Sequence, residues 1–73
     1  MSTKLETKQQ INLIIKEIES YMEILANELS KLDERKATWT DVDTRVAEDC
    51  ERSIIFYTRM IEKFNEALKA IGN

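Results

Sequence analysis

The chain has no histidine and no proline, and it contains only one glycine, Gly72, and one cysteine, Cys50. Histidine is the commonest general acid–base catalyst, and its absence excludes catalysis of that kind. It also excludes histidine-containing zinc sites and Ser-His-Asp triads. A single cysteine cannot form an intramolecular disulfide. A single glycine near the end of the chain excludes glycine-rich phosphate loops and Asn-Gly hairpin turns. We therefore expect a protein that is not an enzyme and that uses no cofactor.

The residues that are present predict a small amphipathic helical protein. Of the 73 residues, 34% are charged and 42% are hydrophobic, which is typical of neither a disordered chain nor a membrane protein. The longest uncharged apolar run, residues 54–57, is far short of the roughly 18 residues that span a bilayer. Residues 1–6 lack the apolar core of a signal peptide. A lone thiol suits the reducing cytoplasm, so we expect a cytoplasmic protein, built as a single domain. Export without a cleaved signal stays open.

Apolar residues recur at alternating steps of three and four in both halves of the chain, the spacing of helices that pack along one seam. The first seam comprises Ile11, Ile15, Ile18, Met22, Leu25, Leu29 and Leu32. The second seam comprises Ala47, Cys50, Ile54, Tyr57, Ile61, Phe64, Leu68 and Ile71. The two seams predict helices over about residues 3–36 and 41–71, with Gly72 ending the second helix.

The segment between the seams predicts a corner at about residues 37–40. Threonines at 38, 40 and 44 are poor helix formers because their β-branched side chains lose rotamers in a helix. Thr40 with Asp43, or Thr38 with Asp41, can cap a new helix. The expected fold is therefore all-α, a two-helix antiparallel hairpin that forms one domain over residues 1–73.

One continuous helix of about 65 residues, in a swapped dimer, is the alternative architecture. Trp39 and Val46 continue the first seam in phase, so the periodicity alone does not exclude it. A continuous helix would leave Ile54, Ile61 and Leu68 off the seam, whereas a hairpin buries all three. The hairpin is the favoured interpretation.

A second set of apolar residues lies off the two seams. Burying each of the larger side chains is worth about 1.5–3 kcal/mol, and two helices alone cover each other on one side only. We therefore expect homodimerisation to complete a four-helix bundle, and a second protein is a further expected partner. The predicted partner or dimer interface comprises Ile14, Tyr21, Ile24, Trp39, Ile55, Phe56 and Met60. For Trp39 two interpretations stay open, because it can also close the corner by packing on Leu32, Val42 or Val46.

Charge is segregated along the chain. Residues 17–51 carry eleven acidic and four basic side chains, whereas the segments before and after them are each net positive by two, which gives the overall charge of −3. A hairpin of this sequence has an acidic corner half and a basic open half. We therefore expect a head-to-tail dimer, in which acidic corners lie beside basic open ends.

The acids near the corner form the one cluster that looks like a site for a hard metal ion. In a calcium loop beginning at Asp41, the sixth position should be glycine and the twelfth an acid, but these positions are Val46 and Arg52. We interpret Asp41 and Asp43 as acids that complement the positive end of a helix, and we expect no metal site.

The corner tripeptide Trp39-Thr40-Asp41 resembles the Trp-x-Gly corner of the small helical substrates of type VII secretion, with Asp41 where that family has glycine. The resemblance implies a helical hairpin and a secreted or structural subunit. The size and the expected architecture also resemble the small hairpin co-chaperones of type III secretion needle proteins. One substituted tripeptide and a shared size assign the chain to neither family.

Together these patterns predict a non-enzymatic protein–protein interaction module that acts as a chaperone, an adaptor or an inhibitor of a partner protein. The acidic chain has scattered basic residues and no aromatic interleaving, so we expect no direct binding of nucleic acid and no membrane partner. Two alternatives stay open. One is an acidic nucleic-acid mimic that inhibits a nucleic-acid-binding protein, as some phage proteins do. The other is the structural or secreted hairpin subunit.

Overall fold

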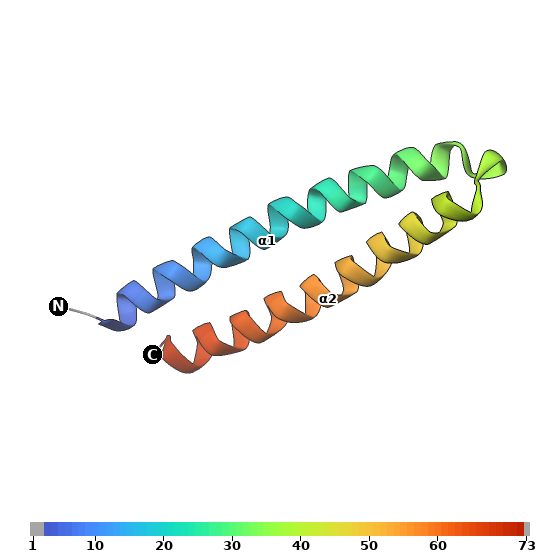
Figure 1. The fold of residues 1–73 in the computed structure, drawn as a ribbon. Helices are drawn as coiled ribbons and strands as arrows, with labels where there is room; N and C mark the ends of the chain where they lie inside the picture. The colour runs from blue at the N-terminus through green and yellow to red at the C-terminus, as the bar shows by residue number, and fades with distance from the viewer. Residues whose placement is uncertain (1–2, 73) are drawn as a thin grey trace.

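The computed structural model describes residues 3–72 as two long helices that run antiparallel and are joined by a short corner (Figure 1). Helix α1 spans Thr3–Glu34, a 3-10 turn η1 spans Lys36–Thr38, and helix α2 spans Asp41–Ile71. These residues contain no strand. The predicted all-α hairpin is confirmed, and the chain reverses direction where the alternative architecture would have continued as one helix.

The corner begins earlier than the sequence indicates, because α1 ends at Glu34 and not near residue 36. Arg35 leaves the α-helical region, with φ −117° and ψ 30°. The backbone N–H of Thr38 then donates to the Arg35 carbonyl at 3.0 Å, and that of Trp39 donates to the Lys36 carbonyl at 3.2 Å. These i to i+3 hydrogen bonds form the tight turn that replaces the last expected residues of α1.

Helix α2 begins with a capping box, one of the two caps that the sequence offers. The Asp43 N–H donates to Thr40 Oγ1 at 3.2 Å, and the Thr40 N–H donates to Asp43 Oδ2 at 3.0 Å. Each bond satisfies a backbone amide that the helix itself leaves without an acceptor. The Thr38 hydroxyl is used differently, since it donates to the Arg35 carbonyl at 2.9 Å.

The helices pack along the two predicted seams, but the contact is one row of side chains deep. Every seam residue is buried or half-buried, and the five most covered apolar residues of the described chain are Ile15, Ile18, Leu32, Ala47 and Cys50. Among residues 3–72, no side chain is less than 2% exposed. The radius of gyration is 16.6 Å, against about 11 Å for a compact domain of this length. The hairpin is a rod of 57 × 15 × 14 Å whose core is a seam.

At the open end, the Lys8 ammonium of α1 donates a hydrogen bond to the Gly72 carbonyl that follows α2, at 3.1 Å. Gly72 has right-handed backbone angles, φ −62° and ψ −20°. A Cβ at this position would lie 2.7 Å from the Leu68 carbonyl oxygen, so close approach to the last turn explains the glycine. Neither α1 nor α2 is apolar enough over a sufficient length to cross a membrane.

Candidate interaction surface

Two neighbouring residues of α2, Ile55 and Phe56, define the two sides of the hairpin. Successive residues of a helix are rotated by about 100°, so Ile55 and Phe56 project to opposite sides of the seam residues Ile54 and Tyr57. Both are largely exposed, Ile55 at 53% and Phe56 at 60%. The exposed apolar residues of the hairpin therefore belong to two different sides and do not form one surface.

Aromatic rings connect the two helices on the Phe56 side. The rings of Tyr21 and Tyr57 meet edge to face, with centroids 5.4 Å apart and planes at 74°. The rings of Phe56 and Tyr57 are 5.6 Å apart and inclined by 65°. This contact fixes which side of α1 lies beside Phe56, because Tyr21 leans to that side of its own helix.

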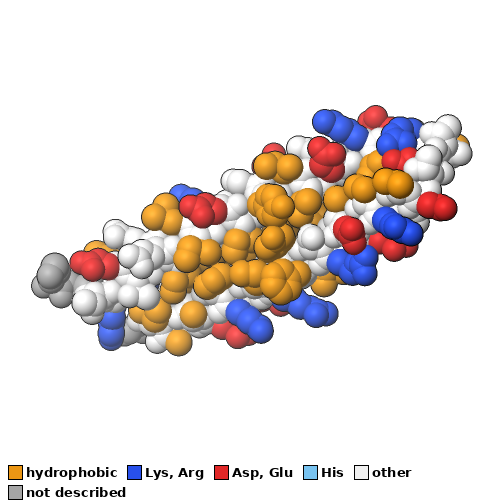
Figure 2. All heavy atoms as spheres, in the orientation of Figure 1, with side chains coloured by type: hydrophobic (Ala, Val, Ile, Leu, Met, Phe, Trp, Pro, Cys, Tyr) orange, Lys and Arg blue, Asp and Glu red, His pale blue; other side chains and the backbone are white. Residues whose placement is uncertain are grey.

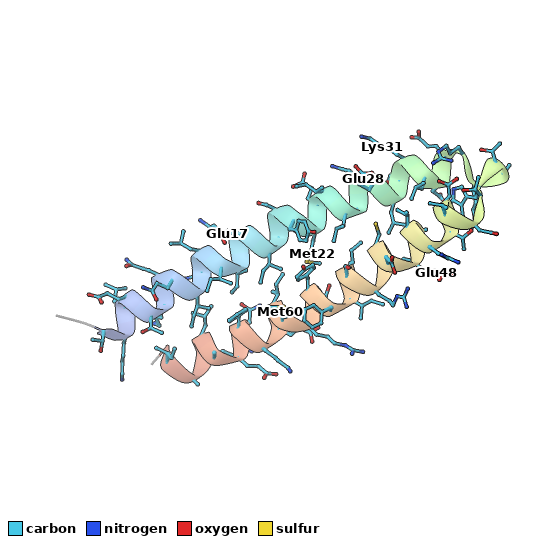
Figure 3. All side chains as sticks on the ribbon, in the orientation of Figure 1. Glu17, Met22, Glu28, Lys31, Glu48 and Met60 are labelled. Carbon is cyan, nitrogen blue, oxygen red and sulfur yellow. The ribbon has the colours of Figure 1, made fainter. Side chains whose placement is uncertain are left out.

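The residues on this side form a continuous apolar surface, which we call the aromatic face. Ile14 lies two turns before Tyr21, Ile24 one turn after it, and Met60 one turn after Phe56. Figure 2 shows hydrophobic side chains gathered over the middle of both helices on one side of the rod. Figure 3 shows Met22 and Met60 in this central part. The aromatic face comprises Ile14, Tyr21, Ile24, Phe56 and Met60.

Ile55 does not lie on the aromatic face, although its apolar character placed it with Ile14, Tyr21 and Phe56 in the predicted interface. It lines a shallow hollow on the other side of α2 with Glu48, Glu51 and Arg52. The grouping was made from apolar character alone, which does not distinguish the two flanks of a seam. We call the side of the hairpin opposite the aromatic face the back face. Charged side chains surround Ile55 there.

Trp39 also lies apart from the aromatic face. Its indole Nε1–H donates to the Leu32 carbonyl at 2.7 Å, and the Lys36 ammonium lies 5.5 Å from the ring centroid. The side chain is half-buried, and Phe56 is about 25 Å further along α2. Of the two interpretations that the sequence left open, these contacts favour closure of the corner.

The acids at the corner are bound by the chain itself. Arg35 donates two hydrogen bonds to Asp43, from Nη1 to Oδ2 at 2.9 Å and from Nη2 to Oδ1 at 2.8 Å. These bonds, followed by the bond from the Thr40 backbone, hold the pKa of Asp43 well below its usual range. The bond to Asp43 likewise raises the pKa of Arg35. Within residues 3–72, no three Cys, Asp or Glu side chains are grouped so as to hold a metal ion.

Several exposed apolar residues were not identified as candidates from the sequence. Val42 and Val46 lie on the aromatic side of α2 near the corner, and Leu13 lines a second shallow hollow with Gln9, Asn12 and Lys16. The sequence did contain a signal for these three residues, because each is apolar and none is among the residues of either seam. The lone thiol, Cys50, is buried on the seam between the helices. No protein-family model, curated protein or solved structure matches the chain, so its function has to be argued from this geometry.

Proposed function

We propose that this protein is a non-enzymatic protein–protein interaction module that associates through the aromatic face, with a second copy of itself and with a partner protein. The observation that carries the proposal is the contrast between the core and this face. Among residues 3–72 no large side chain is completely buried, while Tyr21, Ile24 and Phe56 are left about half exposed or more. Covering such side chains is worth about 1.5–3 kcal/mol each, which is a large contribution for a small domain.

The shape and composition of the aromatic face suit a helical partner. It is a strip along two parallel cylinders, and a helix or a second hairpin can fill the groove between them. Aromatic and methionine side chains are enriched in the centres of such interfaces. A chaperone, an adaptor and an inhibitor would all use the strip in the same way.

Replacing the two neighbouring exposed residues of α2 tests the proposal. Phe56→Glu places a charge in the centre of the aromatic face, whereas Ile55→Glu places the same charge on the back face. Both positions are similarly exposed and lie one residue apart in one helix, so helix propensity and net charge are matched. We expect a dimer at micromolar concentration for the parent and for Ile55→Glu, and a monomer of unchanged helicity for Phe56→Glu.

Sedimentation equilibrium and circular dichroism provide the two measurements. A parent protein that is monomeric at all concentrations would contradict self-association through the aromatic face. Equal weakening of the dimer by both substitutions would show that the side of the hairpin does not matter, and this too would contradict the proposal.

The back face supports a second candidate, the acidic nucleic-acid mimic. Glu48 and Glu62 lie one heptad before and after Ile55, and Glu19 and Glu23 occupy the corresponding side of α1. A mimic that binds through these acids would release its captured partner when salt is raised or duplex DNA is added. It would also lose that partner on combining Glu48→Lys with Glu62→Lys, and it would keep the partner in Phe56→Glu.

A further inference from the structure

We propose that the occupant of the aromatic face is a second copy of the chain, packed face to face with the two corners at the same end. This inference rests on the proposed function and adds to it the partner and its orientation. It follows from the charges that border the aromatic face, which were not apparent from charge summed along the sequence.

On α1, the outer border of the aromatic face is one row of residues spaced by seven. Glu17, Ile24 and Lys31 follow one another at two-turn intervals and so lie on one line along the helix. Figure 3 labels Glu17 and Lys31 along this helix, on either side of its centre. Read outward from the corner, the row is positive, apolar and negative.

On α2, the matching border has the opposite order of charge. Asp49, Phe56 and Lys63 are again spaced by seven, so the row read outward from the corner is negative, apolar and positive. The Tyr21–Tyr57 contact aligns the helices, which places Ile24 within about 3 Å of the level of Phe56 along the rod. Equal spacing then places Lys31 level with Asp49, and Glu17 level with Lys63.

This arrangement makes the aromatic face complementary to itself. When a second hairpin is laid over it with the corners together, α1 lies on the partner's α2. Lys31 then meets the partner's Asp49, Ile24 meets the partner's Phe56, and Glu17 meets the partner's Lys63. Each contact occurs twice because a two-fold dimer repeats it. A face that matches its own charge pattern so closely favours a second copy over an unrelated protein.

The head-to-tail orientation also satisfies these two rows, since Lys31 would meet the partner's Glu17, and Asp49 the partner's Lys63. A third row separates the two orientations. Arg45, Arg52 and Arg59 are spaced by seven along the outermost side of α2. With corners together, Arg45 lies beside the partner's Glu34, at the same level of α1. Head to tail, Arg52 lies beside the partner's Arg59, and like charges oppose each other. Asp49 of the same helix binds Arg52 at 2.7 Å and offsets part of this repulsion.

The acidic charge of the corner half does not reverse this preference. One acid of the corner half, Glu28, lies on the aromatic face one heptad after Tyr21, and Lys31 one turn further on offsets its charge. Glu19, Glu23, Glu48 and Glu51 lie on the back face, on the far side of a hairpin 14 Å thick. In a face-to-face dimer the two sets are separated by about 28 Å, far beyond the Debye length of about 8–10 Å in physiological salt. The contacts at the border of the aromatic face therefore determine the orientation.

The size of the surface is sufficient for a stable dimer. The whole hairpin has an outline of 57 × 15 Å, a projected area of about 850 Å², so a face-to-face dimer has room for the roughly 800 Å² that a standard interface buries on each partner. The apolar centre supplies most of the association free energy, and the bordering charges select the orientation.

Two double variants that share the substitution Glu17→Lys test the orientation. Within residues 3–72, Glu17, Lys31 and Lys63 take part in no ion pair, so reversing them breaks no such contact in the hairpin. Glu17→Lys alone should raise the dimer Kd about tenfold, because it opposes the partner's Lys63 twice. Adding Lys63→Glu should restore the parent Kd. Adding Lys31→Glu instead should weaken the dimer further, because it opposes the partner's Asp49.

Sedimentation equilibrium at constant salt measures the dissociation constants of the parent and the three variants. Circular dichroism checks that helicity is unchanged, as expected for exchanges between two good helix formers. Restoration by Lys63→Glu and not by Lys31→Glu supports corners together. Restoration by Lys31→Glu, by both or by neither overturns this arrangement while leaving the proposed function in place. A monomeric parent overturns the proposed function and, with it, this inference.

Discussion

The corner and the middle of the hairpin are stabilised in opposite ways. At the corner, polar groups find partners within the chain: Asp43 is held by Arg35 and by Thr40, and the Trp39 indole is held by the Leu32 carbonyl. In the middle, Tyr21 and Phe56 contact Tyr57 but remain largely open to solvent. The corner is complete in one chain, because local hydrogen bonds fix the reversal. The middle leaves apolar surface that only a further layer can cover.

The largest expected effect comes from breaking the seam in the middle. Ile18→Asp places a charge without a partner among the most buried side chains of α1, and we expect it to unfold the hairpin. The measurement is the loss of the helical circular dichroism signal at 25 °C. Ser20→Asp, two residues away and exposed, is the control and should stay folded. A native melting midpoint for Ile18→Asp would show that the seam is not the core.

Removing the cap tests whether the corner is as self-sufficient as the contacts indicate. Thr40→Ala deletes the acceptor of the Asp43 amide and should destabilise the protein by about 1 kcal/mol. The matched control is Thr58→Ala in the middle of α2, where the hydroxyl donates to the Ile54 carbonyl of a helix that is already hydrogen-bonded. Urea unfolding should show Thr58→Ala to be neutral or slightly stabilised. A loss equal to that of Thr40→Ala would mean that the cap has no special role.

Trp39→Phe sharpens the comparison at the corner, because it keeps a six-membered aromatic ring and removes the indole donor. The Leu32 carbonyl would lose its 2.7 Å partner, which should cost about 1 kcal/mol in urea unfolding. Self-association should be unchanged, because Trp39 lies apart from the aromatic face. Weaker dimerisation with unchanged stability would instead assign Trp39 to the interface.

The smallest expected effect is a pH dependence that belongs to the corner. The pKa of Asp43 is lowered in the folded protein, so its contribution is present above the unfolded value of about 3.9 and is lost as the pH falls below it. Between pH 5 and pH 2, the melting midpoint of the parent should therefore fall further than that of Asp43→Asn. Parallel curves for the two proteins would show that the Arg35–Asp43 pair contributes nothing.

The sequence predicted the features that depend on periodicity and on local chemistry. The two seams were recognisable because a three-four spacing survives over each helix, and the Thr40–Asp43 cap because its partners are three residues apart. The Arg35–Asp43 pair was not found, because it joins residues across the turn and depends on α1 ending at Glu34. The separation of Ile55 from Phe56 was not predicted, because apolar character does not indicate on which flank of a seam a residue lies. The rows of alternating charge needed the same assignment before they could be recognised.

The position of Cys50 makes its thiol a probe of how often the two helices separate. The thiol lies on the seam where α2 faces α1, 8% exposed, and it is the only cysteine in the sequence. A thiol reagent can reach it only when the helices separate, so the rate of modification reports how often they do. When reclosing is fast, that rate follows the population of the opened form, and when the reagent outpaces reclosing it follows the opening rate itself. The rate of thiol modification therefore measures the opening of the seam in the parent protein, without an introduced cysteine.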